Sequence, residues 1–466
     1  MNVFNSLTRR NEELKPIEGN TIRLYTCGPT VYNFAHIGNF RAYTFEDILR
    51  RVIQFNGMKV KQVMNLTDVD DKTIKGANAA GVKLTDYTKT YKDAFFADLK
   101  KLNIQPAEVY PAATDHIPEM IALVQKLMEK GVAYQSEDKS VYFKVREFPG
   151  YGKLAHIDFD NQRTGLRCAD DEYDKENVGD FALWKAWEES DGPVAWDSPW
   201  GKGRPGWHIE CSAMSMKYLG ETFDLHTGGI DNLFPHHENE IAQAEAATGK
   251  EFVKTWMHCA HLRVNGEKMS KSLGNFFTVR DIAKDFDLEA VRMFMLGVHY
   301  RNPVNFSREL IEQAENALER LRTARTRLDE AQTVSEVTDA DRAFEASLDG
   351  FKERFDAAMD DDLNTADALG VLFELARAAN TFVTVPRSGE AVEKAKALYD
   401  GLTKVLGLLQ HKKEEQFPAE AVRMLEERQA ARKAKDFKKA DALRDALKAM
   451  GFVVEDTANG PKLKRA

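Results

Sequence analysis

The chain has 466 residues, more than one hydrophobic core usually organises, so its length predicts two to four domains. Hydrophobic residues make up 43% and charged residues 30%, which fits a globular protein and excludes an extensively disordered or fibrous chain. The net charge of −9 excludes unspecific polyanion binding by the whole molecule, because such binding depends on phosphate neutralisation by Lys and Arg. A nucleic-acid partner would therefore need local basic surfaces.

The N-terminus and the cysteine content indicate the compartment. The first residues, MNVFNSLTRRNEELKP, lack a basic start followed by an apolar segment, and no apolar run approaches the roughly 18 residues of a membrane-spanning helix. We expect a cytoplasmic protein with no membrane partner. Four cysteines, at positions 27, 168, 211 and 259, are too few for a disulfide scaffold and indicate a reducing compartment. Cys168 and Cys259 fit ordinary buried thiols, and metal or catalytic roles stay open for the others.

A strand, a helix and a second strand open the chain. The patterns predict a strand over 21–27, a turn over 27–30, an amphipathic helix from Ile37 to about Phe55 and a strand over 59–66. This order begins a parallel nucleotide-binding α/β sheet, in which ligands bind beyond the carboxyl ends of the strands. The residues expected at that edge are Cys27, Gly28, His36 and Thr67. An ordinary unit of this kind without a site is the alternative.

Changes in composition and periodicity divide the rest of the chain into regions. Short apolar runs broken by Gly, Pro and Asp predict an inserted region over 111–205, between two halves of one α/β domain at 1–110 and 206–307. Helical periodicity over 308–410 predicts a bundle, with helices near 308–332, 339–358, 364–383 and 390–410.

A small module is predicted for 411–466. After a linker at 412–417 come a charged helix over about 418–449 and a short strand at 451–454. This segment carries 14 Lys plus Arg against 10 Asp plus Glu on an otherwise acidic protein. It is the first place to look for a nucleic-acid contact.

Two segments far apart in the chain could handle phosphate together. His36-Ile-Gly-Asn39 stands at a predicted helix start, where free backbone N–H groups and the helix dipole favour an anion. There His36 and Asn39 could donate to phosphate, and Gly38 would let a flat base approach the backbone. In the segment from Lys268 to Ser272, Lys268 and Lys271 could close two ammonium groups over a triphosphate. Each segment alone also fits a helix cap or a solvated basic turn.

Two further segments supply side chains suited to a metal. His236 and Glu240 stand four apart at a predicted helix start and so share one face. With Cys27 and Cys211 brought in from the sheet, the set is two thiolates, one imidazole and one carboxylate, which favours zinc over magnesium or calcium. His237, three residues before Glu240, is the alternative imidazole.

The two phosphate segments together resemble the HIGH and KMSKS segments of the class I aminoacyl-tRNA synthetases. The resemblance implies an ATP-dependent ligase that joins an amino-acid carboxylate to the α-phosphate of ATP, releases pyrophosphate, and passes the aminoacyl group to the 3′ end of a tRNA. It implies Mg²⁺ with the ATP, phosphate contacts by His36 and Asn39, and stabilisation of the departing pyrophosphate by Lys268 and Lys271. Asn39 stands where the family motif more commonly has His, and it keeps a side-chain donor.

Five segments make the resemblance narrower, to the cysteinyl-tRNA synthetase family. They are Cys27–Tyr32, Asn65–Lys72, Phe181–Lys185, Arg204–Cys211 and His236–Glu240. In that family, zinc held by the residues matching Cys27, Cys211, His236 and Glu240 coordinates the substrate thiolate. Serine differs from cysteine by one atom of similar shape, which hydrophobic contacts distinguish poorly. Zinc bonds a thiolate more readily than a hydroxyl, so the resemblance implies one Zn²⁺ per chain and no editing domain.

The same resemblance implies a fold and a wider set of contacts. The fold is α/β, a Rossmann-like parallel-sheet catalytic domain with an insertion, followed by a helical bundle and a small C-terminal anticodon-binding module. The residues expected to line the amino-acid pocket are Gly28, Thr30, Thr67, Trp207 and His226. The further residues expected at ATP are Gly38 and, near the ribose, Asp231. The tRNA contacts implied in the terminal module are Arg432, Phe437, Asp441 and Asp456. Ordinary core, turn or solvated positions are the alternative for the weaker members.

The expected partners are ATP, L-cysteine and tRNA(Cys), and the expected form is a monomer. A related ligase that activates cysteine and joins it to an amino sugar, as in mycothiol synthesis, resembles the catalytic part but lacks a terminal module. The segment after residue 411 therefore favours tRNA. A non-catalytic tRNA-binding paralogue is the other alternative, and the intact His36, Lys268, Lys271 and candidate ligands argue against it.

Overall fold

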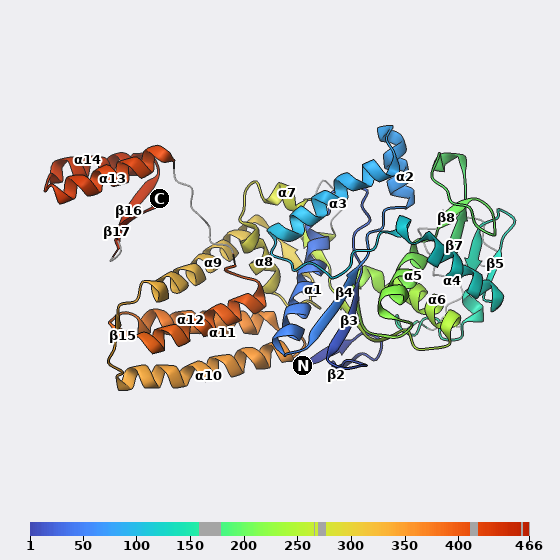
Figure 1. The fold of residues 1–466 in the computed structure, drawn as a ribbon, viewed down its shortest axis with the longest axis horizontal. Coiled ribbons are helices and arrows are strands. Elements are labelled where there is room, and N and C mark those ends of the chain that lie inside the picture. Colours follow the sequence, from blue (N-terminus) through green and yellow to red (C-terminus); the bar gives the residue numbers. More distant parts are fainter. Residues whose placement is uncertain (158–178, 265, 269–275, 411–417, 458–459, 466) are drawn as a thin grey trace.

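A computed structural model describes residues 1–157, 179–264, 266–268, 276–410, 418–457 and 460–465. The molecule is elongated (Figure 1), with an α/β part at one end, a helical bundle next to it and a small module beyond the bundle. The predicted fold class is thereby confirmed. Among the described residues, no helix combines the length and apolar character needed to cross a bilayer.

The centre of the α/β part is a four-stranded parallel sheet in the order β10-β9-β3-β4. Its strands are β3 (Thr21–Thr26), β4 (Lys59–Met64), β9 (Phe223–Gly229) and β10 (Val253–Cys259). Helix α1 (Ile37–Phe55) connects β3 to β4, and α6 (Glu238–Thr248) connects β9 to β10. The two units extend in opposite directions from the boundary between β3 and β9. That boundary is the switch point at which such sheets bind ligands.

Helix α1 has the bounds that the sequence predicted. Its apolar residues recur at helical spacing, and Ile48, Leu49 and Val52 pack in one core with Ile22 and Leu24 of β3. This packing holds the N-terminus of the helix beside the carboxyl end of the strand. The two predicted strands are confirmed, although β3 ends one residue earlier than expected and β4 two residues earlier.

The region between the two halves contains a second sheet, which is antiparallel with the order β5-β6-β7-β8. Its strands are β5 (Ala133–Gln135), β6 (Val141–Phe143), β7 (Phe181–Ala186) and β8 (Gly203–Pro205). The helices near it are α2 (Asp71–Ala80), α4 (Ile117–Glu129) and α5 (Trp207–Leu219), whereas α3 (Leu84–Lys101) packs in a core with α1 and the later helix over 288–296. The rings of Phe143 and Phe181 stack at 5.0 Å, so the aromatic cluster of the sequence forms part of this core.

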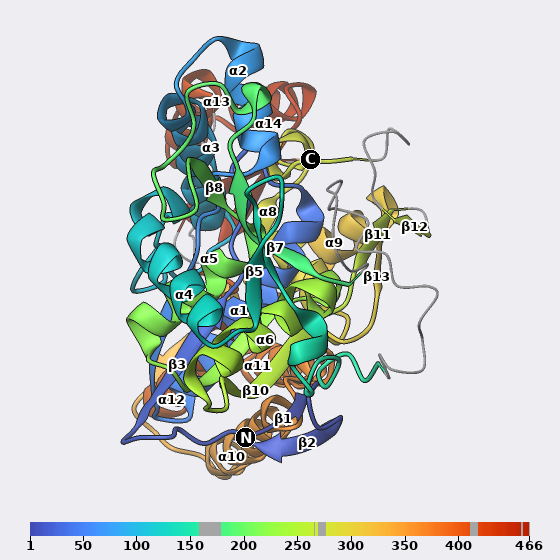
Figure 2. The same cartoon turned by 90° about the vertical axis from the view of Figure 1, so that its right-hand side faces the viewer.

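A small sheet and two helices link the parallel sheet to the bundle. The sheet contains β11 (Leu262–Val264), β12 (Glu267–Lys268) and β13 (Val304–Phe306) in the order β12-β11-β13, and the helices are α7 (Val279–Ile282) and α8 (Leu288–Leu296). Arg292 of α8 is fully buried, forms an ion pair with Asp47 of α1 and donates to the Leu406 carbonyl at the end of the bundle. Figure 2 shows α9 and β11–β13 on one side of α1 and α12 on the other.

All four predicted bundle helices are present. They are α9 (Arg308–Asp329), α10 (Asp339–Asp360), α11 (Thr365–Phe382) and α12 (Gly389–Leu406). Short strands β14 (Thr333–Val334) and β15 (Arg387–Ser388) pair at the far end of the bundle. The sequence analysis missed the N-terminal hairpin of β1 (Asn2–Asn5) and β2 (Arg10–Glu13).

The terminal module corrects one prediction, because the single helix expected over 418–449 is two helices. They are α13 (Ala419–Lys433) and α14 (Phe437–Ala449). Lys435 adopts a φ of 62°, which ends α13, and Asp436 then caps α14 by accepting from the Lys439 N–H. The linker predicted at 412–417 lies outside the described residues.

The module has its own small core. Strand β16 (Phe452–Thr457) includes the predicted strand and pairs with a second strand, β17 (Gly460–Arg465), that the sequence analysis missed. The buried residues of this core are Ala421, Leu447, Phe452 and Leu463. Leu463 of β17 is thus a packing residue.

Candidate active site and metal centre

A cavity of about 360 Å³ opens at the carboxyl ends of β3 and β9. This position is expected from the sheet order. The connections that follow β3 and β9 lie on opposite faces of the sheet, and a ligand-binding crevice forms at the switch point between two such strands. The predicted site residues that line it are Cys27, Gly28, Thr30, His36, Gly38, Asn39, Thr67, Trp207, Asp231 and His236. Residues from both halves of the α/β part, about 200 positions apart in the chain, therefore share one wall.

The turn after β3 requires glycine at residue 28. The Gly28 N–H donates to Asn65 Oδ1 at 2.8 Å, and a Cβ at residue 28 would come within 1.8 Å of the Asn65 carbonyl oxygen. Thr30 and Thr67 form a parallel bridge, in which the Val31 N–H donates to the Thr67 carbonyl at 3.0 Å. The ends of β3 and β4 are thereby held together, and they bring three predicted pocket residues to one edge.

His36 and Asn39 cap helix α1 reciprocally. His36 Nδ1 accepts from the Asn39 N–H at 3.2 Å, and Asn39 Oδ1 accepts from the His36 N–H at 3.1 Å. Because Nδ1 acts as an acceptor, a neutral His36 carries its proton on Nε2. The cap thus uses His36 Nδ1 and Asn39 Oδ1. The N–H groups at His36 Nε2 and Asn39 Nδ2 take no part in the cap. Asn39 takes part in this cap through its amide oxygen.

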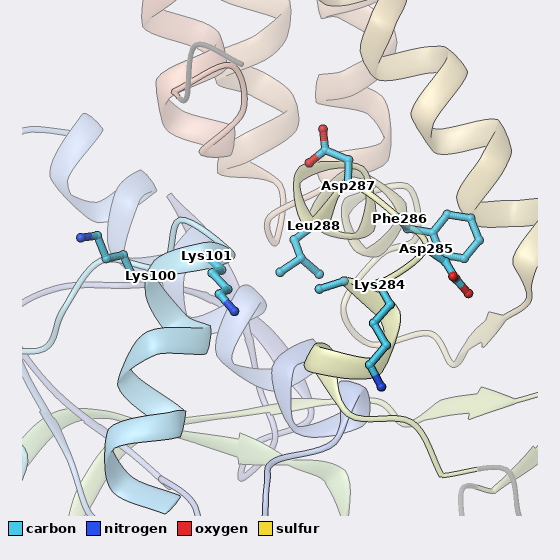
Figure 3. A pocket seen from close by; sticks show the side chains of 8 residues that line it. Lys100, Lys101, Lys284, Asp285, Phe286, Asp287 and Leu288 are labelled. Carbon is cyan, nitrogen blue, oxygen red and sulfur yellow. The ribbon is translucent and has the colours of Figure 1, made fainter. Parts of the chain in front are cut away.

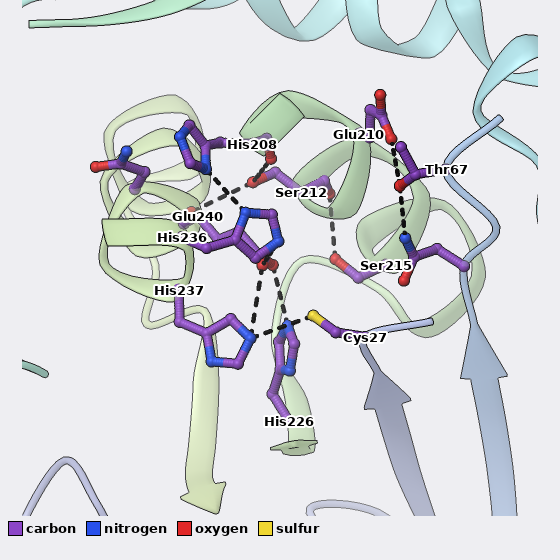
Figure 4. Close-up of polar contacts among 12 residues, drawn as sticks. Cys27, Thr67, His208, Glu210, Ser212, Ser215, His226, His236, His237 and Glu240 are labelled. Atoms are coloured by element: carbon purple, nitrogen blue, oxygen red, sulfur yellow. Dashed lines mark hydrogen bonds and ion pairs between the residues drawn. The ribbon is translucent and has the colours of Figure 1, made fainter. Parts of the chain in front are cut away.

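Four candidate metal ligands converge from four elements. Cys27 follows β3, Cys211 lies in α5, His236 lies in a π-helical turn over Leu233–His237, and Glu240 lies in the first turn of α6. Their ligand atoms all lie within 4.8 Å of one another. Figure 4 shows Cys27, His236 and Glu240 turned toward one another at the base of the site.

This donor set fits zinc. A tetrahedral ion with bonds of about 2.0–2.3 Å separates its ligand atoms by roughly 3.3–3.8 Å, which falls inside the observed limit. Glu240 Oε1 is buried and accepts no hydrogen bond, although His236 Nε2 lies 3.1 Å away. A cation between these atoms would satisfy this buried carboxylate oxygen, which lacks a well-directed hydrogen bond.

A second set shares two members with the first. Cys27, His226, His237 and Glu240 also place their ligand atoms within 4.8 Å. His237, the alternative imidazole of the sequence analysis, contacts Cys27 Sγ through Nε2 at 3.2 Å. However, His226 and His237 are fully buried and do not line the cavity, whereas Cys27 and His236 do. The set with two thiolates is therefore the one that a substrate in the cavity can reach.

Charges at the centre are strongly coupled. The hydrogen bond between the two thiols is the main effect: it lowers the pKa of Cys211 to about 6 and raises the pKa of Cys27 well above its usual value. Burial by itself lowers the pKa of His236, but the Glu240 carboxylate and Cys211 raise it to about 10. Burial opposes ionisation of Glu240, yet His226 and His236 lower its pKa.

These pKa values predict proton release on zinc uptake. At pH 7.5 Cys211 and Glu240 are ionised, whereas Cys27 and His236 keep protons that must leave before they bind a metal. Calorimetry of the metal-free protein in buffers of different ionisation enthalpy should show about two protons released per zinc bound. Because raising the pH removes the competing protons, the apparent affinity should increase from pH 6 to pH 9. An affinity independent of pH would contradict this charge assignment.

The sequence analysis named His236 and His237 but missed His208 and His258, which contact them around the centre. His208 Nδ1 lies 2.8 Å from His236 Nδ1, His237 Nδ1 lies 2.9 Å from His258 Nε2, and His258 Nδ1 lies 2.7 Å from Ser6 Oγ. Burial lowers the pKa of His258 to about 3, so its ring is neutral. The only sequence signal was the position of His208 beside predicted site residues.

Other predicted pocket residues take different places. The Trp207 ring stacks on the His236 ring at 4.2 Å, and both residues line the cavity. His226 lies behind the cavity wall, with Nε2 3.0 Å from Glu240 Oε2 and its ring stacked on Trp256. Asp231 is exposed at the rim, 4.0 Å from His261 Nδ1.

A buried relay lies behind Thr67. The Thr67 hydroxyl donates to Glu210 Oε2 at 2.9 Å and accepts from the Asn65 amide at 3.2 Å. Burial raises the pKa of Glu210 well above its usual value. The relay was not foreseen, although Glu210 belongs to a segment that the sequence analysis singled out.

The lysine segment is described only at its start. The backbone of Lys268 pairs with Arg263 across β11 and β12, next to the strand whose Leu262 lines the cavity. Lys271 lies outside the described residues, as does Cys168. Cys259, expected to be an ordinary thiol, is buried, and burial raises its pKa to about 12.

The predicted tRNA contacts lie on the terminal module. Arg432 is exposed in the last turn of α13, and Phe437 is 62% exposed at the start of α14. Asp441 forms an ion pair with Arg444 at 3.0 Å. Asp456 belongs to β16, and its side chain is not among the described parts. An exposed phenylalanine beside basic residues is suited to stacking on an unpaired base.

Comparisons with known proteins agree over the whole chain. Residues 13–316 match the tRNA synthetases class I (C) catalytic domain, 354–410 match the DALR domain, and 414–460 match the cysteinyl-tRNA ligase anticodon binding domain. The cysteine--tRNA ligase of Protochlamydia amoebophila is 49% identical over 100% of this chain and 98% of its own length. That of Caldicellulosiruptor saccharolyticus is 47% identical over 100% of both.

Solved structures agree in fold. A Mycobacterium tuberculosis methionyl-tRNA synthetase in complex with methionyl-adenylate superposes with a TM-score of 0.59 and 18% identity over 83% of this chain and 90% of that chain. A putative arginyl-tRNA synthetase from Campylobacter jejuni gives a TM-score of 0.55 at 13% identity over 86% and 95%. With the catalytic and anticodon-binding matches in one chain, and high identity to cysteine--tRNA ligases from end to end, the chain belongs to the cysteine--tRNA ligase family of class I ATP-dependent ligases.

Proposed function

We propose that this ligase selects cysteine through a zinc ion held by Cys27, Cys211, His236 and Glu240. The observation that carries the proposal is the convergence of these four ligand atoms within 4.8 Å, with Glu240 Oε1 buried and accepting no hydrogen bond. When bound there, zinc would supply a Lewis-acid partner for the substrate thiolate that a serine hydroxyl does not match.

The chain's own residues would orient the reactants in the cavity. The substrate side chain would point to the face formed by Cys27 and His236, and the stacked Trp207 would exclude water from it. ATP would extend from Asp231, near the ribose, to the N-terminus of α1 near Gly38. There the helix dipole and the donors of His36 and Asn39 favour phosphate oxygens.

Phosphate chemistry would then depend on position and charge. The substrate carboxylate would attack the α-phosphate, with Mg²⁺ on the nucleotide and Lys268 and Lys271 stabilising the pyrophosphate that leaves. Little covalent chemistry is required of the protein. We propose that the protein acts as a monomer.

The alternative of an amino-sugar ligase is disfavoured by the anticodon-binding match at 414–460. A non-catalytic paralogue is disfavoured by the complete candidate ligand set. The basic module would instead hold the anticodon end of tRNA(Cys), with Arg432, Phe437, Asp441 and Asp456 as its proposed contacts.

Pyrophosphate exchange into ATP tests the selection. The zinc-loaded protein should catalyse exchange with L-cysteine and at least about 10⁴-fold less well with L-serine, the range reached by sites that recognise one specific substrate group. Charging of tRNA(Cys) measured beside it reports the second step. Equal exchange with the two amino acids would refute zinc-based selection, even if tRNA were charged.

A further inference from the structure

A groove between α9 and α11 carries three arginines that contact no carboxylate of the described residues. The groove has a volume of about 360 Å³, and its basic residues are Arg320 and Arg327 of α9 and Arg377 of α11. Arg320 and Arg327 are seven residues apart and therefore share one face of α9. Phe373, Arg377 and Thr381, at intervals of four, form the facing wall on α11.

The lack of a carboxylate partner among the described residues distinguishes Arg320 and Arg327 from the other arginines of α9, Arg308, Arg322 and Arg325, which are all paired. Arg322 on the same helix pairs with Asp287 at 2.9 Å, and Arg325 pairs with Asp400 at 2.6 Å. In the described part of the chain, no carboxylate oxygen lies within 4.0 Å of a guanidinium nitrogen of the three groove arginines. On a protein of net charge −9, this is a local concentration of uncompensated positive charge.

A contact with an aromatic ring restricts the orientation of one groove arginine. The Arg320 guanidinium lies over the Phe373 ring, 5.1 Å from its centre, which restricts its orientation. The Thr381 hydroxyl donates to the Arg377 carbonyl at 3.0 Å and so serves its own helix. The guanidinium groups are thus the strong donors that face a ligand, and their planar geometry suits the oxygens of a phosphate.

A wider depression offers a useful contrast (Figure 3). It has a volume of about 650 Å³ between α3 and the segment that joins α7 to α8. Its Lys284 pairs with Asp281 at 2.9 Å, and its Asp285 pairs with Arg308. Two aspartates, Asp285 and Asp287, line it beside three lysines, so its positive charge is largely offset.

The position of the groove suits a long substrate. Figure 1 shows the bundle between the α/β part, which holds the cavity, and the terminal module. Helix α9 begins directly after β13, so at 1.5 Å per residue Arg320 lies about 18 Å along it and Arg327 about 28 Å. A tRNA whose 3′ end enters the cavity and whose anticodon meets the module would pass along the bundle.

We propose that this groove binds phosphates of the tRNA backbone between the acceptor end and the anticodon. The inference adds an intermediate contact to the two ends that the ligase family implies, and it depends on tRNA being the substrate. Phosphate contacts of this kind position a nucleic acid without reading its sequence. They therefore predict a change in tRNA affinity and not in amino-acid activation.

The test is the triple variant Arg320→Gln, Arg327→Gln, Arg377→Gln in the full chain. The KM for tRNA(Cys) in charging should rise by about 10- to 100-fold with kcat little changed, since three exposed charge-assisted contacts are lost. The slope of log affinity against log salt should become shallower by up to about three. Cysteine-dependent pyrophosphate exchange should stay at the native rate, which also shows that the variant is folded.

Two controls make the result decisive. The variant Arg342→Gln, Lys352→Gln, Arg354→Gln removes the same charge from α10 and should leave the KM for tRNA near native. Arg→Lys changes at the three groove positions should restore most of the salt dependence. An unchanged KM and salt slope in the groove variant, or an equal loss in the α10 variant, would overturn the proposal. If the native chain itself fails to charge tRNA(Cys), the proposed function fails instead.

Discussion

Replacing Cys211 by Ser should lower the kcat/KM of cysteine-dependent pyrophosphate exchange by more than about 100-fold, the upper end of the loss caused by removing a residue behind a metal ligand. Cys211 is 1% exposed and carries the lower pKa of the two thiols, so it is the thiolate present before any metal binds. Without it, the centre keeps one thiol, and bound zinc measured by atomic absorption should fall with the exchange rate.

The selectivity of the same variant separates metal loss from general damage. Preference for cysteine over serine should collapse, because in the proposed mechanism the metal is what distinguishes sulfur from oxygen. The matched control is Cys259→Ser, which changes another buried thiol, 2% exposed and outside the candidate ligand set. It should keep zinc content and selectivity. A Cys211→Ser protein with native selectivity would show that Cys211 is not a ligand.

Ending the chain after Gln410 should leave cysteine activation near native but lower kcat/KM for tRNA(Cys) charging by about 100-fold or more. The four described elements of the module pack around their own core, so their removal exposes little of the catalytic part. Each stacked base contributes about 1–3 kcal/mol and each 1.4 kcal/mol is tenfold, so loss of two anticodon contacts accounts for this fall.

A point variant tests the same idea in the full chain. Phe437→Ala removes a side chain that is 62% exposed and should raise the KM for tRNA by roughly 5- to 100-fold if the ring stacks on a base. Met450→Ala, which truncates another exposed apolar residue, 38% exposed after α14, should have little effect. Undiminished charging by the truncated chain would show that the module does not recognise tRNA.

The sequence by itself determined the elements whose signals are local. Helix α1 has the predicted bounds because the apolar spacing from Ile37 to Phe55 and the stop at Asn56-Gly57 act within one segment. The bundle helices α9 to α12 were located within a few residues for the same reason. The break between α13 and α14 was missed, because Lys435 adopts its positive φ without a glycine or proline to mark it.

The chemistry of the site was suggested by the sequence, largely through family resemblance, but its geometry was not. Cys27 and Cys211 are 184 positions apart, and only the order β10-β9-β3-β4 and the packing of α5 bring them together. The same packing decided that His236 faces the cavity and that His237 lies beneath it. Which imidazole lines the cavity depends on side-chain direction in a π-helical turn, which residue spacing does not specify.

The proposed tRNA surfaces show the same division. Composition located a basic C-terminal segment, yet the five arginines of α9 look alike in sequence. Only the tertiary structure places Asp287 and Asp400 beside Arg322 and Arg325 and leaves Arg320 and Arg327 without a carboxylate neighbour among the described residues. The charge that a surface presents depends on which residues are neighbours in space, because an ion pair neutralises a residue that is counted as basic from the sequence alone.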